Sequence, residues 1–132
     1  MQTIGTQDLC GRRILIVEDE PLMLRLLEKF FARRGYEVLA ASDGQQAIEI
    51  YQDNHPQIDV VLLDFRLPKS TGERVFQSFK AANAGVKVVI ATGFIEPEKR
   101  TELIFAGVKR FVNKPYVLDE LLEVLQSVID HD

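Results

Sequence analysis

The sequence predicts an α/β protein with a single doubly wound five-stranded parallel sheet, built from five strand–helix units as (βα)5. Three observations predict this fold class. Five short apolar runs alternate along the chain with segments of helical periodicity. Several of these runs are almost continuously apolar, as expected of parallel strands that are buried on both faces. The length of 132 residues and the hydrophobic content of 46% suit one domain with a sizeable core.

The predicted strands are short and follow one another at regular intervals. They lie at residues 14–17 (ILIV), 37–41 (EVLAA), 60–63 (VVLL), 86–91 (VKVVIA) and 110–112 (RFV). The expected strand order is the flavodoxin-like 2-1-3-4-5. In sheets of this kind, ligands bind beyond the carboxyl ends of the strands at the point where the strand order reverses. The polar residues that follow the strands are therefore the ones to consider for function.

The first predicted helix begins near Pro21, because proline is favoured in the first helical turn. Gly35 follows it as a C-terminal cap. The apolar side chains that this helix is expected to bury are Met23, Leu26, Leu27 and Phe30.

Further helices fill the remaining gaps between the strands. One begins at SDGQQAIEIY, with Ser42 or Asp43 as its N-cap. Another spans roughly residues 73–82, and a fourth spans roughly 97–106 and ends at Gly107. The last helix repeats apolar residues at steps of three and four, namely Leu118, Leu121, Leu122, Leu125, Val128 and Ile129.

Composition excludes several classes of function. The net charge of −4 provides no basic field, so direct nucleic-acid binding is not expected. Cys10 is the single cysteine, which rules out an internal disulfide and a thiolate metal cluster. The N-terminus lacks the pattern of a signal peptide, and no apolar run reaches the length of a membrane span. We expect a cytoplasmic protein with an N-terminal tail or linker at 1–11 and one domain at 12–130.

The residues that follow the strands form a chemically matched set. Glu18 and Asp19 follow the first strand, Asp64 the third, Thr92 the fourth and Lys114 the fifth. In the order 2-1-3-4-5 these strands are consecutive neighbours. Three carboxylates, a hydroxyl and an ammonium group should therefore converge at one edge of the sheet.

Each of these residues also has a purely structural explanation. Asp19 could cap the first helix, Thr92 could belong to a turn, and Asp64 could begin an Asx turn. Lys114 could be an ordinary surface lysine. Because all of them fall on the same sheet edge with matched chemistry, a functional site is favoured.

The cluster of carboxylates predicts a divalent cation. Three neighbouring carboxylates repel one another unless a cation lies between them. Oxygen ligands with room for water suit Mg²⁺, which prefers one or two carboxylates together with phosphate oxygens. Asp64 would then act as an in-line nucleophile toward a phosphoryl group, and Thr92 and Lys114 would hold the phosphoryl oxygens.

The motifs in register resemble the receiver domain of bacterial two-component response regulators, of the chemotaxis-regulator type. The matching segments are ILIVEDE with Glu18 and Asp19, VVLLDFRLP…G with Asp64, VVIATG with Thr92, and FVNKP with Lys114. The resemblance covers roughly residues 12–130. Each motif is weak alone, but four of them in order on five βα units are specific.

The resemblance implies a role for each site residue. Asp64 would accept a phosphoryl group from a phosphohistidine of a sensor histidine kinase or a histidine phosphotransfer domain. Mg²⁺ would be bound by Asp19, Asp64 and the backbone carbonyl of Arg66, with Glu18 acting through water. Thr92 and Lys114 would grip the phosphoryl group. Such a chain takes part in phosphoryl transfer without being a conventional enzyme.

The resemblance also implies a switch. Thr92 would move toward the phosphoryl group and the aromatic residue Phe111 would turn inward. The face formed by the fourth strand, the fourth helix and the fifth strand would then change and present a different surface to a downstream protein target. A homodimer through the fourth and fifth helices and a monomer both stay open. The candidate contacts on this surface are Ile95, Ile104 and Val117.

Other functions remain open at this stage. The chain could be the receiver portion of a hybrid sensor histidine kinase, or an interaction module that works without phosphorylation. An FMN protein of the same topology is disfavoured because the first loop, VEDEP, is acidic where phosphate would bind. A dehalogenase-type phosphatase is disfavoured because Arg66 stands where its second aspartate would be.

Overall fold

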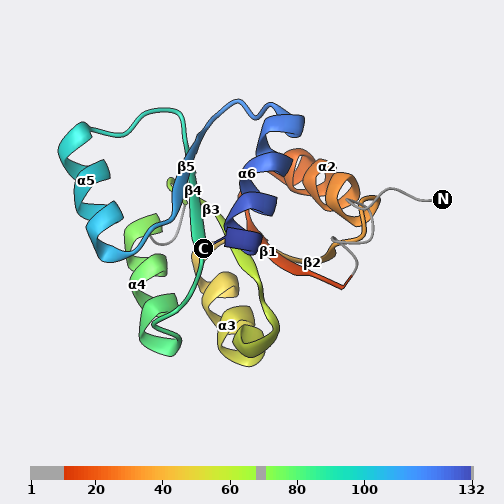
Figure 1. Cartoon of the computed structure of the whole chain (residues 1–132), viewed down its shortest axis with the longest axis horizontal. Helices are drawn as coiled ribbons and strands as arrows, with labels where there is room; N and C mark the ends of the chain where they lie inside the picture. The colour runs from red at the N-terminus through yellow and green to blue at the C-terminus, as the bar shows by residue number, and fades with distance from the viewer. Residues whose placement is uncertain (1–10, 68–70, 132) are drawn as a thin grey trace.

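The described part of the chain is a three-layer α/β arrangement around one parallel sheet (Figure 1). The structure, a computed structural model, describes residues 11–67 and 71–131. The predicted N-terminal tail lies outside the described residues, apart from Gly11. The five strands are parallel throughout and occur in the order β2-β1-β3-β4-β5, which confirms the predicted topology.

The elements alternate along the chain as the sequence predicts. The strands are β1 (Arg13–Val17), β2 (Glu37–Ala41), β3 (Val60–Asp64), β4 (Val88–Thr92) and β5 (Arg110–Asn113). The helices are α2 (Pro21–Ala32), α3 (Gly44–Asn54), the short 3₁₀ helix η1 (His55–Gln57), α4 (Gly72–Ala82), α5 (Pro97–Ala106) and α6 (Leu118–His131). None of these described helices combines the length and apolar character that crossing a bilayer would require.

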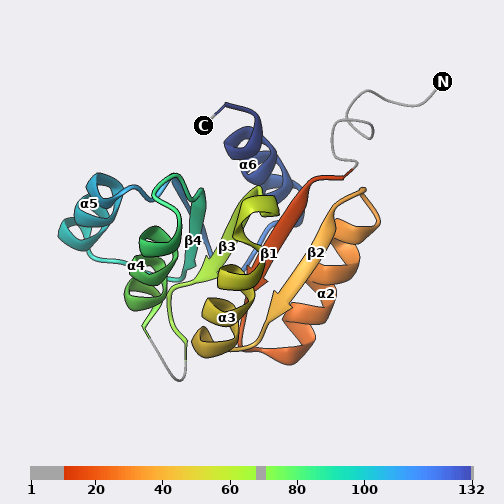
Figure 2. The ribbon, with the colours of Figure 1, turned by 90° about the horizontal axis from the view of Figure 1, so that it is seen from below.

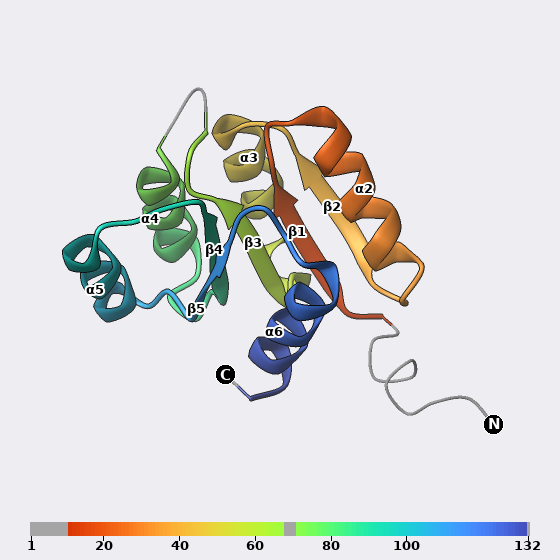
Figure 3. The same ribbon diagram turned by 90° about the horizontal axis from the view of Figure 1, so that it is seen from above.

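The sheet separates two apolar clusters. Figure 2 shows α3 and α4 in front of the sheet, and Figure 3 shows α6 in front of it from the opposite side. On β3, Val61 and Leu63 pack with α3, α4 and α5, whereas Val60 and Leu62 pack with α2 and α6. This alternation is the two-residue period of a strand buried on both faces. The central strands are therefore covered by packed helices on both faces of the sheet.

Glu20 is the N-cap of α2, because the Glu20 side chain accepts a hydrogen bond of 2.7 Å from the backbone N–H of Met23. The alternative role of Asp19 as the helix cap is therefore wrong. Its carboxylate is available to the side chains at the carboxyl ends of the strands, Glu18, Asp64 and Lys114, which together with Asp19 we call the strand-end cluster. The following helix, α3, is capped by Asp43, one of the two residues predicted for that position.

The prediction for the buried face of α2 is wrong at Leu26, which is 47% exposed. Leu27 and Phe31, which are four residues apart on the same face, are the fully buried side chains of this helix. The helix ends at Ala32, and Gly35 lies in the following turn with a φ of 95°. Gly35 therefore supports the turn into β2 and is not the cap itself.

Tyr36, beside α2, carries a buried hydroxyl with no hydrogen-bond partner among the described residues. Burial, together with the nearby Asp130 carboxylate, raises the pKa of Tyr36 from 10 to about 12. The neutral hydroxyl is therefore favoured in the folded state. The stability that depends on this neutral form is present below pH 10 and is lost as the pH rises toward 12.

We expect Tyr36→Phe to be neutral or stabilising by about 1 kcal/mol at neutral pH, because it removes an unpaired polar group. It should also reduce the loss of stability between pH 10 and pH 12. Urea unfolding across that range measures both effects. Tyr51→Phe is the matched control, since the Tyr51 hydroxyl accepts a hydrogen bond of 3.1 Å from Asn83. Tyr51→Phe should destabilise the protein. Equal changes in unfolding free energy for Tyr36→Phe and Tyr51→Phe would contradict the prediction.

Candidate functional site

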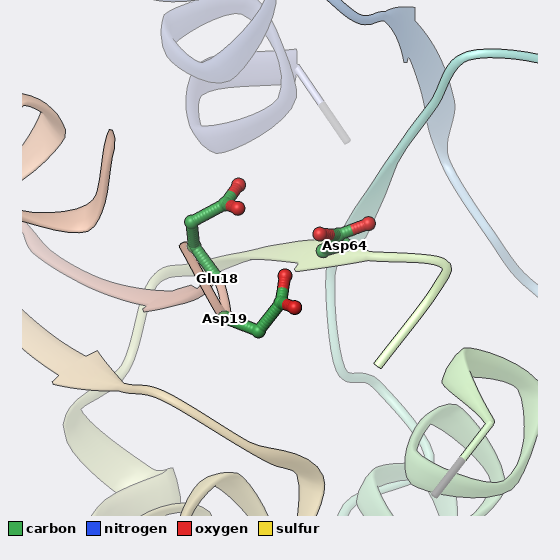
Figure 4. Close-up of side chains that lie close together, drawn as sticks. All are labelled: Glu18, Asp19 and Asp64. Carbon is green, nitrogen blue, oxygen red and sulfur yellow. The ribbon is translucent and has the colours of Figure 1, made fainter. Parts of the chain in front are cut away.

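Three carboxylates meet at the carboxyl ends of β1 and β3, where the strand order reverses. Glu18 and Asp19 directly follow β1, and Asp64 is the last residue of β3. Figure 4 shows the three side chains gathered at this edge. Each offers a carboxylate oxygen, and these oxygens all lie within 4.8 Å of one another. The convergence that the sequence predicts is therefore present.

Lys114, which directly follows β5, supplies positive charge to this cluster. Its ammonium nitrogen lies 3.0 Å from Asp64 Oδ2 and 3.4 Å from Glu18 Oε1. The Asp64 side chain is 5% exposed and that of Glu18 is 1% exposed, whereas the lysine side chain is 30% exposed. The lysine thus reaches from the rim of the site onto two buried carboxylates. It is not an ordinary surface lysine.

The electrostatics of the cluster follow from burial. Burial raises the pKa of Glu18, and the neighbouring Asp64 carboxylate raises it further. Burial also raises the pKa of Asp64, although the hydrogen bond from Lys114 opposes this. For Lys114, burial by itself lowers the pKa, but the contacts with Asp64 and Glu18 outweigh it and the net pKa is raised. Both carboxylates therefore favour an additional cation nearby.

The donor set fits a hard divalent cation. All three side chains offer carboxylate oxygens, and the exposed Asp19 leaves one side of the cluster open to water. Mg²⁺ prefers such partial coordination by oxygen ligands. The main chain also approaches the cluster, because the N–H of Arg66 donates a hydrogen bond of 3.1 Å to Asp64 Oδ1.

Thr92 ends β4 at the same edge of the sheet and is buried, but its hydroxyl is engaged locally. The hydroxyl donates a hydrogen bond of 2.8 Å to the carbonyl oxygen of Phe94 and accepts a longer one, of 3.3 Å, from the Phe94 N–H. In this conformation Thr92 therefore acts as a turn residue, which was the structural alternative predicted for it. Thr92 lies at the site without a described hydrogen bond to the carboxylates.

Phe111 lies on β5 and is half-buried. Its ring packs against the apolar cluster under α3, α4 and α5, and the Arg100 guanidinium lies 4.8 Å from the ring centroid. The aromatic side chain is thus held between a core contact and a cation on α5. The contacts of Phe111 in this structure are those of a packing residue.

Tyr116 is a site residue that the sequence analysis missed. Its hydroxyl donates a hydrogen bond of 3.3 Å to Glu18 Oε1. Burial, with the Glu18 and Asp64 carboxylates nearby, raises the pKa of Tyr116, so the hydroxyl keeps its proton. The available signal was its position two residues after Lys114, but a tyrosine between a strand and a helix is equally typical of packing.

Apolar side chains are exposed on the surface beside β5. Ile104 and Val117, both predicted contacts, are 51% and 56% exposed, and Ile95 is half-buried. Phe105, on α5, is 87% exposed and was missed by the prediction. These exposed side chains belong to α5 and to the segment after β5, which are parts of the face that the sequence predicts to change.

The fold and the strand-end cluster agree with comparisons to known proteins. The family model described as the response regulator receiver domain matches residues 14–126. The chain therefore belongs to the response regulator receiver domain family, whose members act in two-component signal transduction.

Two curated relatives illustrate how such domains occur. The regulatory protein AtoC of Escherichia coli (strain K12) is 35% identical over 117 residues, which cover 89% of this chain but 25% of AtoC. The chemotaxis protein CheY of Bacillus subtilis (strain 168) is 29% identical, with 91% of this chain and 99% of CheY covered. The same kind of domain is thus nearly the whole of one relative and a quarter of the other.

Solved structures have the same fold. The non-phosphorylated receiver domain of HemR from Leptospira biflexa has a TM-score of 0.84 at 27% identity, covering 92% of this chain and 96% of that one. The response regulator TrrA from Thermotoga maritima, solved in complex with Mg²⁺ and beryllium fluoride, has a TM-score of 0.76 at 27% identity. That comparison covers 89% of this chain and 98% of TrrA.

Proposed function

We propose that this chain accepts a phosphoryl group on Asp64 from a phosphohistidine of a sensor histidine kinase or a histidine phosphotransfer domain. The observation that carries the proposal is the placement of Asp64, which is buried at the end of a central strand with Lys114 at 3.0 Å. One Asp64 oxygen forms the bond to phosphorus, the P–N bond of the phosphohistidine breaks, and the imidazole nitrogen keeps the electron pair.

A magnesium ion is the proposed cofactor of this transfer. Asp19, Asp64 and the backbone carbonyl of Arg66 would bind it, and Glu18 would act through water. When bound, Mg²⁺ neutralises the carboxylates and orients the incoming phosphoryl group. The oxygen-only donor set supports this proposal. The complex of the relative TrrA with Mg²⁺ and beryllium fluoride supports it further.

Lys114 and Thr92 are the proposed partners of the phosphoryl oxygens. Lys114 already contacts the Asp64 oxygen, so a small movement would bring its ammonium group onto a phosphoryl oxygen. Thr92 would have to exchange its hydrogen bond with the Phe94 carbonyl for one to the phosphoryl group. Phosphorylation adds about −1.5 to −2 of charge and new acceptor oxygens, which favours both movements.

The proposed output is a change in the face formed by β4, α5 and β5. Movement of Thr92 would free space into which Phe111 turns, as a shift between two populated states. The exposed side chains of Ile104, Phe105 and Val117 make this face suitable for a downstream protein or a second copy of the chain. The net charge of −4 favours protein partners over nucleic acid.

The context of the domain is also part of the proposal. We propose residues 12–130 as the receiver domain and the cytoplasm as its location. Since such a domain makes up 25% of AtoC and 99% of CheY, a stand-alone regulator and a portion of a larger protein, such as a hybrid sensor kinase, are both consistent with the chain.

The proposal is tested by incubating the protein with Mg²⁺ and acetyl phosphate and measuring the intact mass. The wild type should gain one phosphoryl group, EDTA should prevent the gain, and Asp64→Asn should gain none. Asp53→Asn, which changes an exposed aspartate on α3, is the matched control and should be labelled like the wild type.

Two outcomes would contradict the proposal. Labelling of Asp64→Asn would place the phosphoryl group elsewhere. Absence of labelling in the wild type, together with failure to bind beryllium fluoride, would favour an interaction module that works without phosphorylation.

A further inference from the structure

Tyr116 connects two parts of the site that come from opposite ends of the chain. It lies in the segment between β5 and α6, two residues after Lys114. Its hydroxyl donates to Glu18, which follows β1, and its ring centroid is 5.8 Å from the Lys114 ammonium. One side chain therefore contacts both an acid and the lysine of the site.

Glu18 is held by several contacts, each longer than an ordinary strong hydrogen bond. Lys114 lies at 3.4 and 3.5 Å from its two oxygens, the Tyr116 hydroxyl at 3.3 Å from Oε1, and the Glu20 N–H at 3.3 Å from Oε2. Hydrogen bonds between oxygen atoms are typically about 2.7–2.8 Å long. The orientation of this buried carboxylate therefore depends on the whole set of donors.

We propose that Tyr116 is a positioning residue that holds the Glu18 carboxylate in the orientation required beside the metal, and so couples metal binding to the segment between β5 and α6. This inference rests on the proposed function. If Lys114 moves onto a phosphoryl oxygen, the Tyr116 hydroxyl is the side-chain donor that stays on Glu18 among the described contacts. The tyrosine thus keeps the acid in place while the lysine leaves it.

The length of the glutamate side chain matters for this contact. An aspartate at position 18 would withdraw the carboxylate by about 1.5 Å, the length of one carbon–carbon bond. From the present 3.3 Å, the oxygen would then lie beyond hydrogen-bond distance of the Tyr116 hydroxyl. Glu18→Asp therefore keeps an acid at the site but separates it from Tyr116, which makes it the partner variant for a double-mutant cycle.

The experiment measures Mg²⁺ affinity by calorimetry for the wild type, Tyr116→Phe, Glu18→Asp and the double variant. Tyr116→Phe should weaken Mg²⁺ binding about 3- to 10-fold, less than the 10- to 100-fold of direct metal-ligand partners because Glu18 acts through water. In the Glu18→Asp background the same change should have almost no effect. Tyr36→Phe, which removes a buried hydroxyl away from the site, should bind Mg²⁺ like the wild type.

A second measurement needs no metal. In amide NMR spectra of the metal-free protein, Tyr116→Phe should shift the Glu20 N–H, because that group donates to Glu18 Oε2. The Arg66 N–H, which donates to Asp64, should shift less. A shift at Glu20 that disappears in the Glu18→Asp background supports a positioning role, whereas a general packing defect would shift both amides.

The outcomes separate this inference from the proposed function. If Tyr116→Phe bound Mg²⁺ as tightly as the wild type, the proposed role of Tyr116 would be wrong. The same would follow if Tyr116→Phe weakened Mg²⁺ binding equally with Glu18 and with Asp at position 18. Neither result would contradict the proposed acceptor site. Failure of the wild type to bind Mg²⁺ would overturn the proposed metal site and this inference together.

Discussion

Replacing Lys114 with methionine should destabilise the metal-free protein by about 2–3 kcal/mol, and Mg²⁺ should restore most of that loss. The substitution keeps an unbranched side chain, one atom shorter than that of lysine, but leaves the Asp64 and Glu18 carboxylates without the ammonium group. Breaking a fully buried pair costs about 3–5 kcal/mol, and the partial exposure of Lys114 makes the expected loss smaller. A divalent cation that binds the folded state should compensate for the missing charge.

Urea unfolding with and without Mg²⁺ measures this effect. The stabilisation by Mg²⁺ should be larger in Lys114→Met than in the wild type. Lys99→Met is the matched control, because Lys99 also contacts two carboxylates, Glu73 at 3.2 Å and Glu102 at 3.1 Å, but these carboxylates are 35% and 65% exposed. The unfolding free energy of Lys99→Met should stay close to that of the wild type with and without Mg²⁺. Equal stability of Lys114→Met and the wild type without metal would contradict the prediction.

Gly72→Ala should destabilise the protein by about 1–3 kcal/mol and slow the phosphorylation of Asp64. A Cβ atom at position 72 would lie 2.7 Å from the carbonyl oxygen of Phe65 and 2.8 Å from its Cα. Both contacts are with backbone, so the chain must move to relieve them. The Gly72 N–H also donates to that carbonyl oxygen at 3.1 Å, and Phe65 is the neighbour of Asp64. The displacement should therefore reach Asp64, the proposed acceptor.

Gly85→Ala provides the matched control for this substitution. A Cβ atom at position 85 would meet only the Asn83 side chain, at an ordinary contact distance of 3.6 Å. Thermal unfolding and the rate of labelling by acetyl phosphate should both stay close to wild type in this variant. If Gly72→Ala behaved in the same way, the tight contact with Phe65 would have no role in the site.

The positions of the main site residues could be predicted because they depend on topology. Once the alternation of strands and helices indicates the order 2-1-3-4-5, the residues at the carboxyl ends of β1, β3, β4 and β5 must share one edge of the sheet. Asp64 and Lys114 lie 3.0 Å apart although 50 residues separate them in sequence. The central strands could be recognised in the sequence by their continuous apolar residues, which occur because both faces of these strands are buried.

The remaining features depend on side-chain orientation, which the pattern of residue types does not contain. Aspartate is preferred at an N-cap and glutamate is not, yet Glu20 is the cap of α2 because it directly precedes Pro21 and its side chain reaches the Met23 N–H. The exposure of Leu26 follows from the rotation of α2 about its axis. The contact between Tyr116 and Glu18 joins residues 98 positions apart and requires the position of one hydroxyl group.

The unequal packing of the strands has a mechanical consequence. The proposed acceptor Asp64 lies on β3, where every residue is buried, whereas Lys114 follows β5, an edge strand whose residues are all exposed or half-buried. The adjoining helix α5 buries only Leu103. Opening free energies are lowest where few apolar groups are buried, so we expect β5 and α5 to open at a lower free energy than β3. The proposed acceptor thus lies on the most deeply buried part of the sheet, whereas α5, which carries the exposed Ile104 and Phe105, is the part expected to open most readily.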